Sequence, residues 1–162
     1  MTDHAKLAEE KFLKGYTCAQ AVLCAFGDLT GLDEQTALAL SASFGGGMGR
    51  MRLVCGALSG AFMVLGLLYG DYQPGDTAGK AAHYERVRVI GKEFEKRNSS
   101  MICAEILKNS SIAPNAGGAP EERTDEYYKK RRGCIDSIAS AAAILDDYIE
   151  HHPLPEKNGG LL

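Results

Sequence analysis

A run of 17 residues from Leu53 to Tyr69 carries no charged side chain, and it constrains the fold of this chain more than any other feature. The run is at the short limit for a membrane-spanning helix, which needs about 17–25 residues. It contains three glycines, and Arg50 and Arg52 precede it. The neighbouring segments are amphipathic and need an apolar partner. We therefore expect the run to form a helix buried on all sides in a bundle, not a membrane span.

Helical periodicity runs along almost the whole chain, and strand signals are nearly absent. Apolar spacing and capping residues predict helices over about residues 2–14, 17–26, 33–43, 51–69, 76–97, 100–107 and 134–149. The sequence thus predicts an all-α fold, a single helical domain over residues 1–162. It would be a compact bundle of about six or seven helices with one central buried apolar helix. Residues 109–121 should form a loop, and residues 152–162 a frayed C-terminal tail.

The composition excludes several classes of protein. A content of 45% hydrophobic and 24% charged residues is typical of a globular domain, not of a disordered or fibrous chain. The net charge of −3 gives no signal for nucleic acid or an anionic membrane. The polar N-terminus lacks the features of a secretory signal, so we expect a cytoplasmic protein. Small residues around the buried run would tolerate packing against a second copy, so a homo-oligomer is one expected assembly.

The cysteines are the residues most able to carry chemistry. There are five, an odd number that prevents complete internal pairing, and in a reducing cytosol cysteines are more often metal ligands or catalytic thiols than bridges. Four of them fall near predicted helix starts: Cys18, Cys55, Cys103 and Cys134. Free N–H groups and the helix dipole favour a thiolate there. Basic residues precede Cys55 and Cys134, which should lower those thiol pKa values further.

The same four cysteines lie on the inward faces of their predicted helices. Cys24 lies about 240° round the helix from Cys18, so we expect it to be a packing residue. The four are separated by 37, 48 and 31 residues, and no Cys-x-x-Cys pair occurs. That spacing excludes the usual zinc-finger, thioredoxin, ferredoxin and covalent-haem motifs. Any shared site must be assembled by tertiary folding.

A glycine-rich segment precedes the apolar run and ends in a basic residue. It comprises Gly45, Gly46, Gly47, Gly49 and Arg50, which are candidate cofactor-binding residues. Backbone N–H groups in such a loop can cradle an anion, but the Lys-Ser/Thr ending of a P-loop and a preceding strand are missing. The glycines could instead serve a sharp turn or a close approach to a neighbour. A third interpretation directs their N–H groups at the Cys55 sulfur or at a cluster.

Other polar groups carry weaker signals. We expect three of them to be solvated: His83 on a charged helix face, the pair Asp146–Asp147, and the basic run Lys129–Arg132. His4 is terminal. No Ser-His-Asp order and no His-Glu-x-x-His motif is present.

Three segments together resemble a known family. They are Gly-Tyr-Thr-Cys-Ala-Gln-Ala-Val at 15–22, Gly-Gly-Gly-Met-Gly-Arg at 45–50, and Cys-Gly-Ala-Leu-Ser-Gly at 55–60, followed by single cysteines at 103 and 134. This pattern, over about 130 residues, resembles the redox-active protein family named C_GCAxxG_C_C. The family's four cysteines fall on the four selected above. Thr17 stands where the family is expected to have Asn.

The resemblance implies a redox or metal role for these cysteines. Relatives related to split-Soret cytochromes carry haem, but this chain lacks the attachment motif, so we expect no covalent haem. The first hypothesis is a redox protein, an oxidoreductase or electron-transfer protein with an unidentified redox partner. Its four cysteines converge to bind an iron–sulfur cluster or another metal, or to cycle between dithiol and disulfide. The alternatives are a structural zinc domain and a non-enzymatic helical interaction module whose cysteines only pack.

Overall fold

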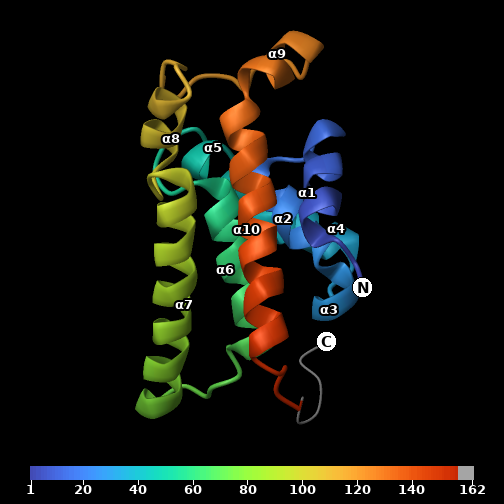
Figure 1. The fold of residues 1–162 in the computed structure, drawn as a ribbon, viewed down its shortest axis with the longest axis vertical. Helices are drawn as coiled ribbons and strands as arrows, with labels where there is room; N and C mark the ends of the chain where they lie inside the picture. The colour runs from blue at the N-terminus through green and yellow to red at the C-terminus, as the bar shows by residue number, and fades with distance from the viewer. Residues whose placement is uncertain (157–162) are drawn as a thin grey trace.

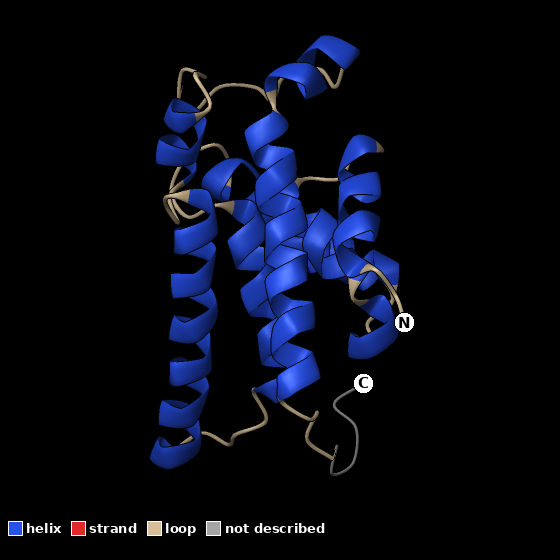
Figure 2. Ribbon diagram, viewed as in Figure 1, coloured by secondary structure: helices blue, strands red, loops and turns tan. Residues whose placement is uncertain are grey.

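The computed structural model describes residues 1–156. Within these residues the chain forms helices and loops and no strand (Figure 2). The helices are α1 (His4–Leu13), α2 (Cys18–Ala25), α3 (Gly27–Thr30), α4 (Glu34–Ser41), the 3-10 helix η1 (Ala42–Phe44), α5 (Gly45–Met48), α6 (Gly56–Tyr69), α7 (Thr77–Asn98), α8 (Cys103–Asn109), α9 (Asp125–Lys130) and α10 (Arg132–His151). The predicted all-α class is confirmed. The number of helices in residues 1–156 is larger than the six or seven expected, because short helices such as α3, α5 and α9 have too few residues to show a period.

Two long helices and the apolar helix organise the bundle. In Figure 1, α10 runs down the middle of the view with α7 on one side and α1 on the other, and α6 lies behind it. Contacts join α10 to α1, α2, α6 and α7. The fully buried side chains between these helices include Phe12, Leu58, Leu65, Phe94 and Ile138. Further contacts join α8 to α10 and to α5, which also contacts α6.

The apolar helix α6 is shorter and less enclosed than expected. It begins at Gly56, not near Met51, because Arg50 and Arg52 have positive φ angles of 64° and 61°. A residue other than glycine rarely adopts that conformation, and a helix cannot pass through it. No residue of α6 is exposed, but one face, formed by residues 62, 63, 66 and 67, is only partly buried. None of the helices in residues 1–156 has the length and apolar character that crossing a membrane requires.

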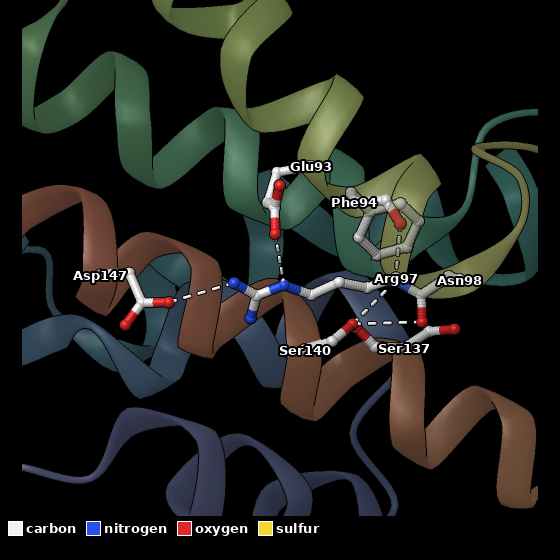
Figure 3. A network of polar contacts seen from close by, with 7 residues as sticks. All are labelled: Glu93, Phe94, Arg97, Asn98, Ser137, Ser140 and Asp147. Carbon is white, nitrogen blue, oxygen red and sulfur yellow. Dashed lines mark hydrogen bonds and ion pairs between the residues drawn. The ribbon is translucent and has the colours of Figure 1, made fainter.

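A polar network joins α7 to α10 (Figure 3). Arg97 bonds Glu93 at 2.8 Å on its own helix and Asp147 at 3.1 Å on α10. The next residue of α7 makes a neutral contact with α10, in which Asn98 Nδ2 donates a hydrogen bond to Ser140 Oγ at 2.8 Å. These contacts hold the C-terminal end of α7 beside the middle of α10.

Two histidines lie in environments that the sequence did not indicate. The ring of His4 is buried, with Nδ1 2.6 Å from Asp146 and Nε2 2.9 Å from Asp28, so Asp146 is paired and not simply solvated. His83 is also buried, contrary to the solvated face expected for it, and its Nδ1 has no hydrogen-bond partner within residues 1–156. Other segments of the chain cover both rings, and the period of apolar residues along one helix cannot predict that burial. Of the expected tail, residues 157–162 lie outside the described residues.

Candidate four-cysteine site

One cavity of about 300 Å³ is lined by all four selected cysteines. Cys18 is the first residue of α2, Cys55 is the N-cap of α6, Cys103 is the first residue of α8, and Cys134 is the third residue of α10. The structure therefore places each of them at a helix start, as expected, and brings them together from four segments. Cys24 lies apart from the cavity, in the hydrophobic core. The role of the four as catalytic residues or metal ligands stays a prediction.

Glycines at the start of α6 bring Cys18 next to Cys55. A Cβ built on Gly56 would lie 2.8 Å from the Phe44 carbonyl oxygen and 3.1 Å from Cys18 Cβ, and one built on Gly60 would lie 2.8 Å from the Ala19 carbonyl oxygen. Contacts this short show that the backbones of α2 and α6 touch with no room for a side chain. The spacing of four residues puts both glycines on one face of α6. This packing explains the Cys-Gly-Ala-x-x-Gly motif physically.

The helix start that carries Cys18 has its own cap. Thr17 Oγ1 accepts a hydrogen bond from the Gln20 amide at 3.2 Å, and Gln20 Oε1 accepts one from the Thr17 amide at 3.0 Å. This reciprocal pair is a capping box. Thr17 therefore performs the capping that an Asn would also perform at this position.

A short antiparallel pairing brings Cys55 next to Cys103. The Cys55 amide donates to the Met101 carbonyl at 2.8 Å, and the Cys103 amide donates to the Leu53 carbonyl at 2.6 Å, on either side of a bridge between Val54 and Ile102. Because Ile102 is extended here, with φ −97° and ψ 126°, α8 begins at Cys103 and not at the predicted cap Ser100. Cys55 and Cys103 become diagonal neighbours on one face of this pairing.

The glycine-rich segment forms a tight turn in the cavity wall. Gly46, Gly47 and Gly49 have positive φ angles of 65°, 69° and 58°. A Cβ on Gly47 would lie 2.7 Å from Cys103 Cβ, and one on Gly45 would lie 2.8 Å from Thr17 Cβ. The interpretation as a sharp turn with close approaches is thus confirmed. All four glycines and Arg50 also line the cavity, and their role in cofactor binding stays a prediction.

Four arginines and one carboxylate share the cavity wall with the cysteines: Arg50, Arg52, Arg123, Arg131 and Glu121. Arg131 is only 5% exposed and bonds Glu121 at 2.6 Å, so this member of the basic run is not solvated as expected. Arg52 Nη1 lies 3.7 Å from Cys103 Sγ. Sequence reasoning missed Arg123 and Glu121, because they belong to a charged segment in which no residue stands out.

The two arginines of the turn also hold the loop that contributes Gly118 and Pro120 to the cavity wall. Arg50 Nε donates to the Gly117 carbonyl and the Gly117 amide donates to the Arg50 carbonyl, both at 2.9 Å. Arg52 Nε donates to the Asn115 carbonyl at 2.9 Å. The loop expected at residues 109–121 begins after Asn109, the last residue of α8. It continues to the Thr124 cap of α9, a helix that the sequence does not predict in this charged segment.

Burial, not the helix starts, dominates the acidity of these thiols. Burial raises the pKa of Cys55 to about 12, against the opposing influence of the Ala57 and Leu58 amides at the start of α6. Burial also raises the pKa of Cys18 well above its ordinary value, and the neighbouring Cys134, Cys55 and Cys103 raise it further. For Cys134, burial raises the pKa and the Arg131 guanidinium opposes the rise. The expected low pKa values are thus wrong for these three thiols, because desolvation penalises the charged form.

The cysteines are five free thiols, and no disulfide joins them. Across residues 1–156, no three side chains of His, Cys, Asp or Glu are gathered closely enough to hold a single metal ion. The four sulfurs therefore border a space and do not converge on a point.

A family model described as "Putative redox-active protein (C_GCAxxG_C_C)" matches residues 16–148. The matched segment contains all four cavity cysteines and both glycines of the α2–α6 contact. No curated protein and no solved structure matches the chain.

Proposed function

Because the chain belongs to the C_GCAxxG_C_C redox-active protein family, we propose that the four-cysteine cavity is a redox centre that holds an iron–sulfur cluster. The observation that carries the proposal is that Cys18, Cys55, Cys103 and Cys134, from four separate segments, line one cavity of about 300 Å³. Four cysteine thiolates are the ligand set of the common iron–sulfur clusters.

The arrangement of the sulfurs favours a group of several atoms over a single ion. A structural zinc site holds one ion tetrahedrally, with each sulfur about 2.3 Å from the metal. The side chains of residues 1–156 form no such close group. A cavity bordered by four thiols supports a cluster better than the structural zinc alternative.

The surrounding residues suit a negatively charged centre. A bound cluster would supply one-electron transfer, with the four thiolates as its ligands. Arg52, which is 8% exposed and 3.7 Å from Cys103 Sγ, and Arg131 beside Cys134 would stabilise the thiolates and affect the potential of the centre. Gly118, Pro120 and Glu121 of the segment 110–124 form part of the cavity wall. Metal ligation would deprotonate these thiols despite their raised pKa values, because a coordinating thiol loses its proton outright.

Dithiol–disulfide cycling is the second candidate. The arginines near Cys103 and Cys134 favour it, because a nearby cation stabilises a thiolate. Against it stands the burial that raises the pKa of the Cys134, Cys18 and Cys55 thiols. A neutral buried thiol is a poor nucleophile.

Anaerobic purification, or reconstitution with iron and sulfide, tests the proposal. We expect visible absorption that bleaches on reduction, with stoichiometric iron and acid-labile sulfide. Cys→Ala substitution at each of the four cavity positions should abolish or alter both. Cys24→Ala, a cysteine of the same chain outside the cavity, should alter neither.

Two outcomes would overturn the cluster. A colourless, metal-free protein in which mild oxidation links two cavity cysteines would establish dithiol chemistry in its place. A colourless protein whose four Cys→Ala variants change no spectrum, metal content or thiol reactivity would leave a helical interaction module.

A further inference from the structure

Arg52 is a buried cation in the cavity wall that has no carboxylate partner within residues 1–156. The residue is 8% exposed. Its contacts are the Asn115 carbonyl oxygen, 2.9 Å from Nε, and Cys103 Sγ, 3.7 Å from Nη1. Neither is an acid. A buried charge without an opposite charge is costly, and it persists in proteins when a partner or ligand compensates it.

Arg123 provides a second, independent sign of a missing partner. Its Nη1 is buried and has no hydrogen-bond partner in the part of the chain that the structure describes. Its Nη2 reaches only the Tyr16 carbonyl, at 3.4 Å. The guanidinium lies 4.6 Å from the ring centroid of Phe12 and 4.9 Å from that of Tyr127, which fixes its place in the wall. A guanidinium held in this way leaves a buried N–H donor without a partner in a residue of the cavity wall.

The other two arginines of the wall already share the one acid there. Glu121 lies 2.6 Å from Arg131 and 3.9 Å from Arg50. The wall therefore contains four guanidinium groups and a single carboxylate. The guanidinium fork matches the oxygens of an oxyanion with two parallel hydrogen bonds. A space of about 300 Å³ equals about ten water molecules at about 30 Å³ each, which is ample for an ion of five heavy atoms.

We propose that the cavity binds a small oxyanion with two negative charges, of the sulfate or phosphate type, through Arg52 and Arg123 beside the four cysteines. This assignment goes beyond the function proposed above, because it concerns binding of the oxyanion beside the redox centre and not its reduction. As a binding site, it can be tested without any cluster.

Titration calorimetry of the reduced, metal-free full chain with sodium sulfate and with sodium phosphate tests the site, with ionic strength held constant by sodium chloride. We expect one site per chain for at least one dianion, and weaker binding of acetate. Arg52→Gln and Arg123→Gln should each weaken binding by about tenfold or more, the loss typical of a charge-assisted hydrogen bond. Arg88→Gln removes an exposed arginine paired with Glu85 on α7 and should leave the affinity unchanged.

Absence of saturable binding, acetate binding as tight as that of the dianions, or affinity unaffected by both substitutions would overturn the assignment. If Arg52→Gln unfolds the protein by circular dichroism, Arg52→Lys decides, because it keeps the charge and loses the fork, and it should weaken binding severalfold. Cys18→Ser keeps both arginines, so it should retain binding of the dianion that the wild type binds while it changes the metal content or spectrum. Failure of this site and failure of the redox centre therefore give different results.

Discussion

Gly56 of α6 lies against Cys18 of α2 so closely that a Cβ on Gly56 would be 3.1 Å from Cys18 Cβ. The contact joins the starts of two helices, and each start carries one of the cavity cysteines. The absence of a side chain at Gly56 is therefore a condition for the cavity and not only a matter of backbone freedom.

Gly56→Ala should destabilise the fold by about 1–3 kcal/mol, because the new methyl group must push α6 away from α2. Denaturant unfolding followed by circular dichroism measures the change. Gly66→Ala is the matched control on the same helix, since a Cβ there meets nothing within 4 Å. It should stabilise by up to about 1 kcal/mol through helix propensity. Equal stability of Gly56→Ala and wild type would contradict the close contact.

Cys55 should be nearly inert to alkylation at neutral pH in the reduced, metal-free protein. Burial raises its pKa to about 12, so at pH 8 the thiolate fraction is on the order of one in 10,000. Mass spectrometry of peptides after timed iodoacetamide labelling measures the rate, which should rise about tenfold for each pH unit above 8. The same protein unfolded in denaturant is the control and should react fast. Rapid labelling of native Cys55 at pH 7 would show an activated thiolate instead.

Asp28 should contribute to acid sensitivity. Burial alone would raise its pKa, but the hydrogen bond and charge of His4 hold the pKa below its ordinary value. The contribution to stability is therefore complete above the unfolded-state pKa of about 3.9, and it is lost as the pH falls through the lower folded-state value.

Asp28→Asn should accordingly lower stability at pH 6 and flatten the loss of stability between pH 5 and pH 2. Thermal unfolding across this range measures it. Asp71→Asn, at an exposed position between α6 and α7, should change neither the stability at pH 6 nor the slope. An unchanged slope for Asp28→Asn would mean that the His4 contact does not affect this carboxylate.

Asn98 and Arg97 of the α7–α10 network should contribute unequally to the free energy of unfolding (Figure 3). Asn98→Ala removes the 2.8 Å bond to Ser140 in a partly buried contact and should cost about 1–2 kcal/mol. Arg97→Ala removes ion pairs whose side chains are at least 36% exposed, and should cost less than about 1 kcal/mol. Denaturant unfolding in low salt and in 1 M sodium chloride separates the two, because salt should reduce only the Arg97 effect. A larger loss for Arg97→Ala would contradict this assignment.

Local sequence patterns were sufficient for much of the fold and for the selection of the site. The period of the apolar residues predicted the long helices, and Asp33 caps α4 as expected, with its carboxylate accepting from Thr36. The sequence does not predict the short helices, because a helix of about one turn has no measurable period of apolar residues. The start of α6 was misplaced because the positive φ angles of Arg50 and Arg52 depend on distant contacts with Asn115 and Gly117.

The sequence by itself determined the helical class, the four cysteines at helix starts and their difference from Cys24, because these depend on spacing along one helix. The tertiary structure alone decided that the four share one cavity, that Arg123 and Arg131 complete its wall, and that burial raises the pKa of Cys18, Cys55 and Cys134. The physical reason is the distance along the chain over which each interaction acts. Capping and periodicity act within a few residues, whereas desolvation and charge depend on atoms that distant segments bring together.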